Sequence, residues 1–396
     1  MRCAWLVALL TGYVIANAPN QDGFGPYGED CLAEKTFLYD PSIFQKTSWY
    51  TIDLDLPPEQ RWAQIAASYG AKMQKAIDVV KFMAEVVLGE GTWDIMMVLM
   101  KDAPDKLREP YRSEIKAMSE MAGVDLSELT LLNIFYEISK ACTSVVAQDN
   151  NGRMYHGRNL DFGFMFNWNK TAHSWDLTDT LKDLVVNLQF VKGGKLLFKG
   201  VTYAGHLGVL TGVRPNAFSV SINTRLGSGN TDWPLLDFFF HGLGDEEFLV
   251  YAMRDMLTNY DNFDEAVNYM ENVPMMTGGY LIMSGPKPGQ GVIITRSANG
   301  TDHEAKVDVT KPDQWYVLQT NYDWNKDVIF LDDRRGPGND CMKRLGQNRV
   351  DLAGIYQVLS SKPTLNKATT YTALMQVNDG ILQTITRTCD DPCWFV

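Results

Sequence analysis

Apolar residues follow two different periods on either side of residue 141. Between Pro57 and about Ala141 they recur every three or four positions, and a second run of this kind covers Asp105–Met121. This spacing predicts amphipathic helices. The segment Asp125-Leu-Ser-Glu128, with acidic residues in the first turn, predicts the start of a further helix.

From Cys142 onward, short apolar or alternating runs are bounded by turn residues, which predicts β-strands. Val145–Tyr155 fits two strands joined by an Asn-Gly turn. Two predicted helices, Asp245–Leu257 and Phe263–Glu271, interrupt the series, so we expect an α+β chain. The other predicted strands are Leu184–Phe190, Leu196–Tyr203, Ala217–Ile222, Gly279–Met283, Gly291–Thr295, Trp315–Thr320, Thr372–Val377 and Ile381–Arg387.

The composition excludes several classes of protein. Of the 396 residues, 45% are hydrophobic and 21% are charged, which is typical of globular proteins and excludes a disordered chain or a coiled coil. The net charge is −12, and no long run of Lys or Arg is present. Both features argue against a nucleic-acid partner and against a polybasic membrane patch.

The first residues have the three parts of a secretory signal. Residues 1–18 combine Arg2, an apolar stretch and a final Ala-Asn-Ala, which predicts a signal peptide that is removed on export. No later stretch reaches about 18 uninterrupted apolar residues, the length that a bilayer requires. The sequons at Asn169 and Asn299 predict glycosylation, as expected for a secreted glycoprotein.

Removal of the signal peptide leaves five cysteines, and an odd number implies one thiol outside any disulfide. That thiol is reactive, paired between chains, or buried as a small apolar group. Cys389 and Cys393 flank a short turn that could close a local ring, which would leave Cys31 with Cys341 and Cys142 unpaired. Four cysteines allow three pairings, so the others stay open.

Several motifs do not have the context that their usual chemistry needs. The G-x-G-x-x-G match at 23–28 lacks a preceding strand, and Asp161-Phe-Gly163 lacks the other kinase motifs. The five histidines are not spaced as zinc ligands, and no G-x-S-x-G elbow is present. The sequence therefore predicts no cofactor and no metal.

The candidate chemistry lies around Cys142. After one hairpin, Arg158 and Asp161 return near this thiol, so Cys142 and Arg158 are expected side by side across an antiparallel pair. A guanidinium beside a thiol favours the thiolate, which is the nucleophile. Cleavage before Cys142 would add an α-amino group as a base, and Asp161 could orient that group. The alternative is a buried free cysteine beside a surface ion pair.

Blocks distributed from about Cys31 to the C-terminus resemble the acid ceramidases, and the related N-acylethanolamine acid amidases share several of them. The blocks are Tyr50-Thr-Ile-Asp-Leu-Asp-Leu-Pro-Pro58, Asn133-Ile-Phe-Tyr-Glu137, Cys142-Thr-Ser, His156-Gly-Arg-Asn-Leu-Asp-Phe-Gly163, Gln319-Thr-Asn-Tyr-Asp323 and Asp332-Asp-Arg-Arg335. The resemblance implies the αββα sandwich of N-terminal-nucleophile hydrolases. It also implies that the precursor cuts itself between Ala141 and Cys142 into an α chain (19–141), mainly helical, and a β chain (142–396).

The resemblance assigns a role to each site residue. Cys142 is the nucleophile and, through its α-amine, the base; Arg158 and Asp161 hold and polarise it. Asn321 donates to the oxyanion, and Arg334 belongs to the supporting network. It further implies one disulfide that joins the two chains as a heterodimer, Cys31–Cys341, and a C-terminal ring, Cys389–Cys393.

The implied activity is hydrolysis of ceramide to sphingosine and a fatty acid in the lysosome, with secretion as a further destination. The implied partners are ceramide or a related N-acyl lipid, a sphingolipid activator protein and, transiently, anionic lysosomal membranes. Two alternatives stay open: an amidase acting on N-acylethanolamines, and a lipid-binding glycoprotein that is never cut.

One position departs from the resemblance. Both families carry Asn-Glu-Arg where this chain has Asn223-Thr-Arg225, and threonine supplies no charge. We therefore expect an activity profile that extends to lower pH than in glutamate-bearing relatives, and Thr224→Glu to move its acid limb upward.

Overall fold

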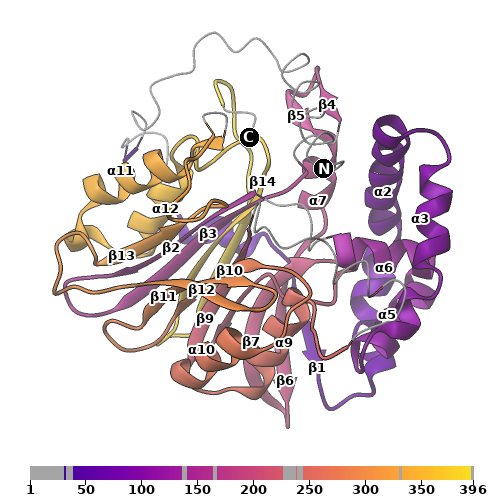
Figure 1. Cartoon of the computed structure of the whole chain (residues 1–396), viewed down its shortest axis with the longest axis horizontal. Coiled ribbons are helices and arrows are strands. Elements are labelled where there is room, and N and C mark those ends of the chain that lie inside the picture. The colour runs from indigo at the N-terminus through magenta and orange to yellow at the C-terminus, as the bar shows by residue number, and fades with distance from the viewer. Residues whose placement is uncertain are drawn as a thin grey trace.

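The computed structural model describes residues 31–32, 39–135, 141–163, 167–225, 238, 244–329 and 332–393. The predicted signal peptide (1–18) and the glycine motif at 23–28 lie outside these residues. Two β-sheets form the centre of the molecule, one of eight and one of five strands (Figure 1).

The larger sheet has the order β1-β6-β7-β8-β9-β10-β11-β12, and the smaller one has the order β13-β2-β3-β14-β15. Neighbouring strands are antiparallel except for the parallel pair of β1 and β6. The larger sheet consists of β1 (Trp49–Asp53), β6 (Val185–Lys192), β7 (Lys195–Tyr203), β8 (Thr211–Arg214), β9 (Phe218–Thr224), β10 (Gly279–Ser284), β11 (Gly291–Ser297) and β12 (Gly300–Lys306). The smaller sheet consists of β13 (Tyr316–Gln319), β2 (Ala141–Gln148), β3 (Met154–Asp161), β14 (Thr369–Gln376) and β15 (Ile381–Thr386), and β4 (Trp168–Asn169) and β5 (Ser174–Trp175) form a separate pair.

Helices cover the outer faces of both sheets. On the larger sheet lie α9 (Leu249–Asn259) and α10 (Phe263–Asn272), and on the smaller one α11 (Arg335–Leu345) and α12 (Leu352–Ser360) (Figure 1). The result is the predicted αββα sandwich. Between the sheets, apolar side chains of both layers pack together, among them Val146, Tyr280, Ile282 and Val317. Each such side chain contributes about 1.5–3 kcal/mol when fully buried.

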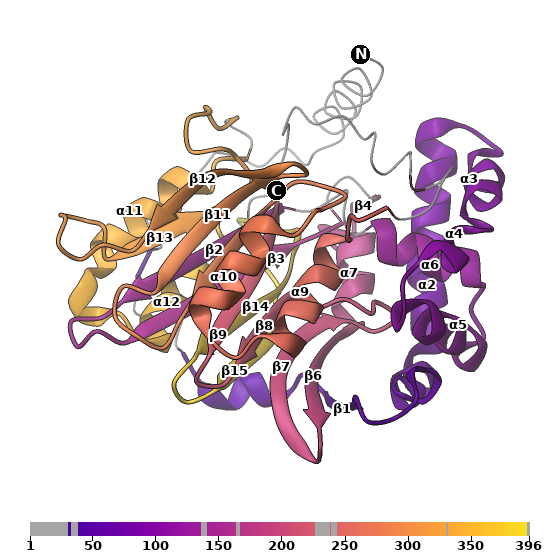
Figure 2. The ribbon, with the colours of Figure 1, turned by 60° about the horizontal axis from the view of Figure 1, so that its bottom comes forward.

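The predicted helical part stands beside the sandwich, as Figure 2 shows. It contains α2 (Ala63–Leu88), α3 (Thr92–Met100), α4 (Ala103–Lys106), α5 (Tyr111–Ala122) and α6 (Leu126–Phe135). The predicted start of α6 is confirmed, because Asp125 Oδ1 accepts the N–H groups of Ser127 and Glu128. Among the described helices, none is long and apolar enough to cross a membrane.

Several elements were not predicted. The N-terminal part also contributes strand β1, which pairs with β6 in the larger sheet. Strand β8 is only four residues long, and β12 is a polar edge strand (Gly-Thr-Asp-His-Glu-Ala-Lys), so neither has an apolar alternation. Helix α11 begins Arg-Gly-Pro-Gly, a composition typical of a turn. The sequence also gave no prediction of α7 (Asp176–Lys182), α12 or the short 3-10 helices η1 (Pro41–Gln45), η2 (Pro58–Gln60) and η4 (Gln347–Arg349).

Candidate active site

Cys142 lies near the start of β2, a central strand of the smaller sheet. In the β2–β3 ladder Cys142 is paired with Leu160, and Arg158 is paired with Ser144. Because side chains of a strand alternate between faces, Cys142 and Arg158 share one face as diagonal neighbours. The expected hairpin neighbourhood is therefore present, but Cys142 and Arg158 are offset by two positions along the ladder and do not lie directly opposite each other.

Arg158 contacts the sulfur directly: its Nη2 donates to Cys142 Sγ at 2.9 Å. The guanidinium is fully buried, and other strands hold it in place. Nη1 donates to Thr211 Oγ1 (2.9 Å) and to Tyr371 Oη (3.1 Å), while Nη2 also donates to the carbonyl of Ile222 (2.9 Å). This contact allows the guanidinium to stabilise negative charge that develops on the sulfur during a reaction.

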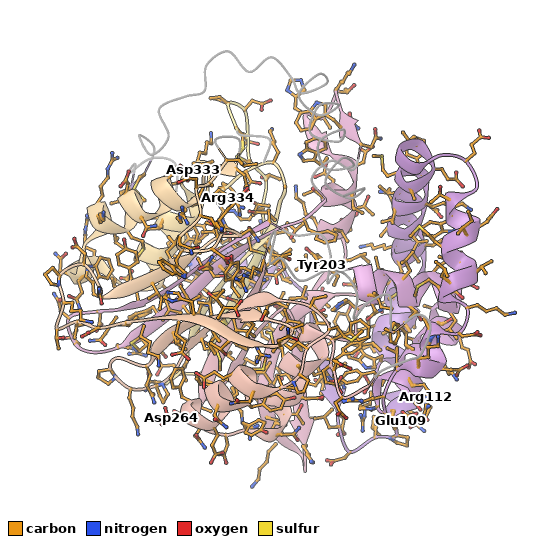
Figure 3. All side chains as sticks on the ribbon, viewed as in Figure 1. Glu109, Arg112, Tyr203, Asp264, Asp333 and Arg334 are labelled. Carbon is orange, nitrogen blue, oxygen red and sulfur yellow. A yellow bond between two sulfur atoms is a disulfide. The ribbon has the colours of Figure 1, made fainter. Side chains whose placement is uncertain are left out.

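Asn321 and Arg334 bind the main chain of Cys142. Its N–H donates to Asn321 Oδ1 at 2.7 Å, and its carbonyl accepts from Arg334 Nη1 at 2.7 Å. Arg334 Nη2 also donates to Asn321 Oδ1 at 2.8 Å. Asn321 follows β13, and Arg334 directly precedes α11 (Figure 3). Two residues that lie 179 and 192 positions after Cys142 in the sequence thus bind its N–H and its carbonyl.

Asp161 reaches Cys142 through Arg334. Its Oδ2 accepts from Arg334 Nη1 (3.1 Å) and Asn366 Nδ2 (3.1 Å), and its Oδ1 accepts from Thr369 Oγ1 (2.6 Å). Burial raises the pKa of Asp161, and the charge of Arg334 opposes that rise. In the uncut chain the described contacts of Asp161 therefore orient Arg334. The predicted contact of Asp161 with the α-ammonium group of Cys142 concerns the cut chain and stays a prediction.

One N–H of the Asn321 amide is engaged in the uncut chain, because its Nδ2 donates to the carbonyl of Thr224 at 2.7 Å. The implied role of Asn321 at an oxyanion stays a prediction. Thr224 Oγ1 itself is buried and has no hydrogen-bond partner within the described part of the chain. The effect of Thr224 on the pH profile stays a prediction.

The two disulfides that the resemblance implies are present. Cys31 is bonded to Cys341, and Cys389 to Cys393, while Cys142 is a buried free cysteine. The first bridge joins residues on opposite sides of the predicted cut. Of the two predicted glycosylation sites, Asn299 is exposed in the turn between β11 and β12, and Asn169 is half-buried in β4; their modification stays a prediction.

Sequence reasoning missed the residues that support the site. Tyr371 and Thr211 hold Arg158, and Asn366 and Thr369 hold Asp161; all four are buried. Buried Thr and Asn residues at strand ends are common, so their sequence positions carry no specific signal. Only the order of the strands brings them together.

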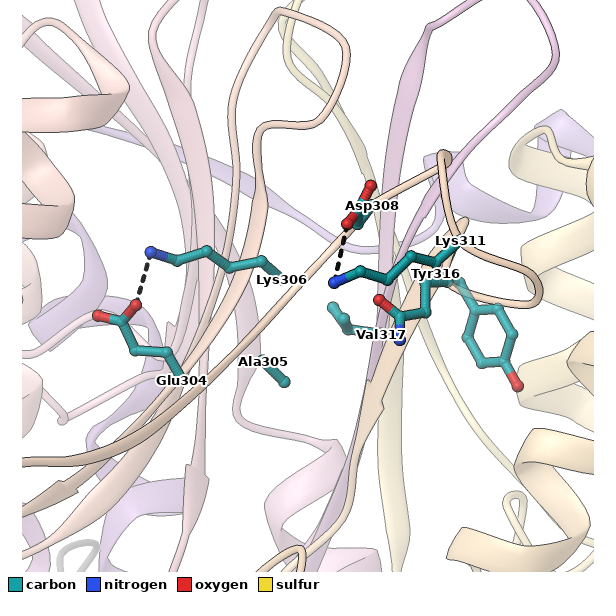
Figure 4. Close-up of a pocket in the computed structure, with 8 residues that line it drawn as sticks. Glu304, Ala305, Lys306, Asp308, Lys311, Tyr316 and Val317 are labelled. Carbon is teal, nitrogen blue, oxygen red and sulfur yellow. Dashed lines mark ion pairs between the residues drawn. The ribbon is translucent and has the colours of Figure 1, made fainter.

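Two surface pockets among the described residues do not involve the site. One has a volume of about 610 Å³ and contains the ion pairs Lys306–Glu304 (2.6 Å) and Lys311–Asp308 (3.1 Å) (Figure 4). The other, of about 220 Å³, lies between β11, β12 and β13. Among the described residues no group of three or more His, Cys, Asp or Glu side chains is arranged to hold a metal ion.

Comparison with known proteins adds family membership to this geometry. The chain is 40% identical to a probable acid ceramidase of Caenorhabditis elegans, over 98% of this chain and 96% of that protein. It is 35% identical to the acid ceramidase of Homo sapiens, over 99% of this chain and 98% of that protein.

The chain belongs to the acid ceramidase family.

Two family models agree with this assignment. Residues 142–336 match the linear amide C–N hydrolases of the choloylglycine hydrolase family, and residues 45–107 match the beta subunit of N-acylethanolamine-hydrolyzing acid amidase. Among solved structures, a C. elegans N-acylethanolamine-hydrolyzing acid amidase ortholog aligns with a TM-score of 0.52 and 30% identity, over 62% of this chain and all of that one. This member of the acid ceramidase family is thus an amidohydrolase of linear amides with the N-terminal-nucleophile hydrolase fold.

Proposed function

We propose that the chain is a precursor cut between Ala141 and Cys142, and that its new N-terminal cysteine hydrolyses the amide of ceramide to sphingosine and a fatty acid. The observation that carries this proposal is the set of contacts on Cys142. Its sulfur, its N–H and its carbonyl are each bound by a different buried side chain, from Arg158, Asn321 and Arg334 respectively. A structural cysteine does not need all three.

In the first reaction, the Cys142 sulfur attacks the carbonyl carbon of Ala141. The C–N bond then breaks, the proton of the thiol passes to the departing nitrogen, and a thioester links the two residues. Water hydrolyses the thioester, which frees the carboxyl group of Ala141 and leaves a thiol and an α-amine on Cys142. Asn321 Oδ1, which accepts the peptide N–H in the uncut chain, is in place to accept from that amine.

In the second reaction, the thiolate attacks the acyl carbon of the lipid amide, and the α-ammonium protonates the leaving sphingosine nitrogen. Asn321 stabilises the oxyanion through an N–H of its Nδ2. Water then releases the fatty acid from the thioester. All five proposed catalytic side chains are fully buried in the uncut chain, so this function requires that cleavage opens a path to the sulfur.

The substrate assignment is supported by relatives named acid ceramidase over almost their full length. N-acylethanolamine stays the alternative substrate, because the similar C. elegans structure is named as an N-acylethanolamine-hydrolyzing acid amidase ortholog. Parallel rates on N-acylsphingosine and N-acylethanolamine, measured on the same cleaved preparation, separate the two. We expect the N-acylsphingosine rate to dominate.

The decisive experiment is N-terminal sequencing of purified protein after incubation at acid pH, with Cys142→Ala as the matched variant. The wild type should yield two chains, one starting at Cys142, and Cys142→Ala should stay whole. An uncut wild-type chain that still binds lipid would favour the lipid-binding glycoprotein instead. Cleavage of Cys142→Ala at the same bond, in the absence of protease, would rule out the intramolecular reaction.

The destination we propose is the lysosome, with secretion as a second one, and the partner surface is a lipid membrane. Helices α2 and α3 expose a group of large apolar side chains: Phe82, Val86, Ile95, Val98 and Leu99. Val98 is 75% exposed and Ile95 is 66% exposed, values unusual for apolar residues in a helix pair. The sphingolipid activator protein stays a prediction from the resemblance.

A further inference from the structure

A series of buried polar side chains links the two sheets beside the site. It contains Ser144 of β2, His156 of β3, and Ser219, Ser221 and Asn223 of β9, each at most 1% exposed. Polar groups at this depth are stable only when they are hydrogen-bonded. The pattern of donors and acceptors in the series can therefore be worked out from its geometry.

The series has a single direction. Ser144 Oγ donates to Asn223 Oδ1 (2.9 Å), and Ser221 Oγ donates to Ser144 Oγ (3.0 Å). Since the proton of Ser221 is used, its oxygen accepts from His156 Nε2 (2.9 Å). His156 Nδ1 then accepts from Ser219 Oγ (3.0 Å). Complete pairing thus requires a neutral imidazole with its proton on Nε2.

The surroundings of His156 keep it in that form. Burial lowers its pKa to about 3, and the positive charge of Arg158 acts in the same direction. An ordinary histidine, with a pKa of about 6.5, is protonated at the acid pH proposed for this protein. His156 stays neutral there, so the series of hydrogen bonds survives acidification.

At its other end the series reaches the residue that binds Cys142. Asn223 Nδ2 donates to the carbonyls of Gln319 (2.9 Å) and Thr320 (3.2 Å). The next residue, Asn321, accepts the N–H of Cys142 at 2.7 Å. Asn223 therefore ties the segment that carries Asn321 to the strand that carries Cys142.

We propose that Asn223 is a positioning residue for the reactions of Cys142, and that neutral His156 keeps Asn223 oriented at acid pH. The inference rests on the proposed function, because the distance between Cys142 and Asn321 matters only if Cys142 is the nucleophile. A displacement of about 1 Å at a reacting group can cost about 100-fold in rate. Asn223 touches neither the sulfur nor the substrate carbonyl in this scheme, so it acts through Asn321.

The test compares two buried asparagines. Asn223→Asp keeps the shape of the side chain but replaces two N–H donors with an acceptor that faces two carbonyls. Asn159 is the matched control: its Nδ2 donates to the carbonyls of Leu359 (2.7 Å) and Thr364 (2.8 Å), and its Oδ1 accepts from Thr372 Oγ1 (2.7 Å). Asn159 has no contact with the segment that carries Asn321 among the hydrogen bonds described.

We expect Asn223→Asp to slow self-cleavage and to lower kcat on ceramide by about 10- to 100-fold, with KM within about twofold. Asn159→Asp should lower the Tm to a similar extent and keep kcat within about twofold. Equal rates for the two variants would overturn the inference while leaving the proposed function intact. A wild type that neither cuts itself nor hydrolyses ceramide would instead overturn the proposed function.

Two further measurements cover the case in which Asn223→Asp does not fold. Ser144→Ala removes one hydroxyl of the series and should slow self-cleavage by about 3- to 10-fold, and an unchanged rate would contradict the inference. Nitrogen NMR of histidine-labelled wild type, with His156→Gln for assignment, should show the neutral Nε2–H form of His156 from pH 7 to about pH 4.5. A protonated His156 at about pH 4.5 would contradict it as well.

Discussion

Arg158 Nη2 lies 2.9 Å from Cys142 Sγ, and the two residues are diagonal neighbours on the inner face of the β2–β3 ladder. The fork shape of the guanidinium makes this contact compatible with several others at once. While one nitrogen faces the sulfur, the other donates to Thr211 and Tyr371. Three strands therefore set the position of the charge beside the sulfur: β3, which carries Arg158, β8, which carries Thr211, and β14, which carries Tyr371.

Arg158→Lys should show that this geometry matters in addition to the charge. A single ammonium cannot contact Sγ and replace the bonds to Thr211 and Tyr371 at the same time. We expect kcat/KM on ceramide to fall by about 100-fold or more and self-cleavage to slow. Arg153→Lys, a half-exposed position just before β3, is the control and should retain wild-type rates. Wild-type rates for Arg158→Lys would show that charge alone is sufficient.

Asp161→Asn should act through Arg334. The variant leaves the shape of the side chain unchanged but removes the charge that Arg334 meets at 3.1 Å in a fully buried pair. We expect a loss of about 1–3 kcal/mol of unfolding free energy and slower self-cleavage. Asp161→Asn, Arg334→Gln and the double variant form a cycle whose coupling energy should exceed about 0.5 kcal/mol. Additive effects would mean that the two side chains act independently.

The Cys31–Cys341 disulfide should hold the two chains together after cleavage at residue 141. The bridge spans 310 residues of sequence and crosses the proposed cut. A non-reducing gel of cleaved protein should show one band, and reduction should separate the chains. Cys31→Ser should separate them without reductant, whereas Cys389→Ser, which opens only the C-terminal ring, should not. Detection of Cys142 in a disulfide of the mature protein would contradict its role as nucleophile.

Glu247 should make the protein more stable at acid pH. Burial raises the pKa of Glu247 to about 7, and the positive charge of Arg108, its ion-pair partner, only partly opposes that rise; Asp255 adds to it. A carboxyl group whose pKa is higher in the folded than in the unfolded state stabilises the fold fully below its ordinary pKa of about 4.3. That contribution is lost as the pH rises through about 7.

Glu247→Gln tests this sign. The Tm of the wild type minus that of the variant should be larger at pH 5 than at pH 7.5, by at least about 2 °C. Glu265→Gln, an exposed position on α10, is the control and should give the same difference at both pH values. A difference that grows with pH for Glu247→Gln would mean that the ion pair with Arg108 outweighs burial.

Local signals in the sequence determined a large part of this protein. The change of period near residue 141, the helices from Pro57 onward and most of the strands follow from side-chain alternation over a few residues. The Asn-Gly turn also predicted that Arg158 lies near Cys142, because a short hairpin brings the end of its second strand next to the start of its first strand. The quoted blocks, such as Cys142-Thr-Ser and Gln319-Thr-Asn-Tyr-Asp323, carried the family resemblance and with it the fold class.

Tertiary structure alone decided which groups meet at Cys142. Asn321 reaches its N–H because β13 pairs with β2, and Arg334 reaches its carbonyl because α11, which it directly precedes, packs against β13. Asp161 faces Arg334 and lies on the opposite face of the ladder from the Cys142 side chain, because it is paired with Ala141 and so belongs to the alternate set of side chains. The order of the strands depends on how complete faces pack, and no short stretch of sequence records that order.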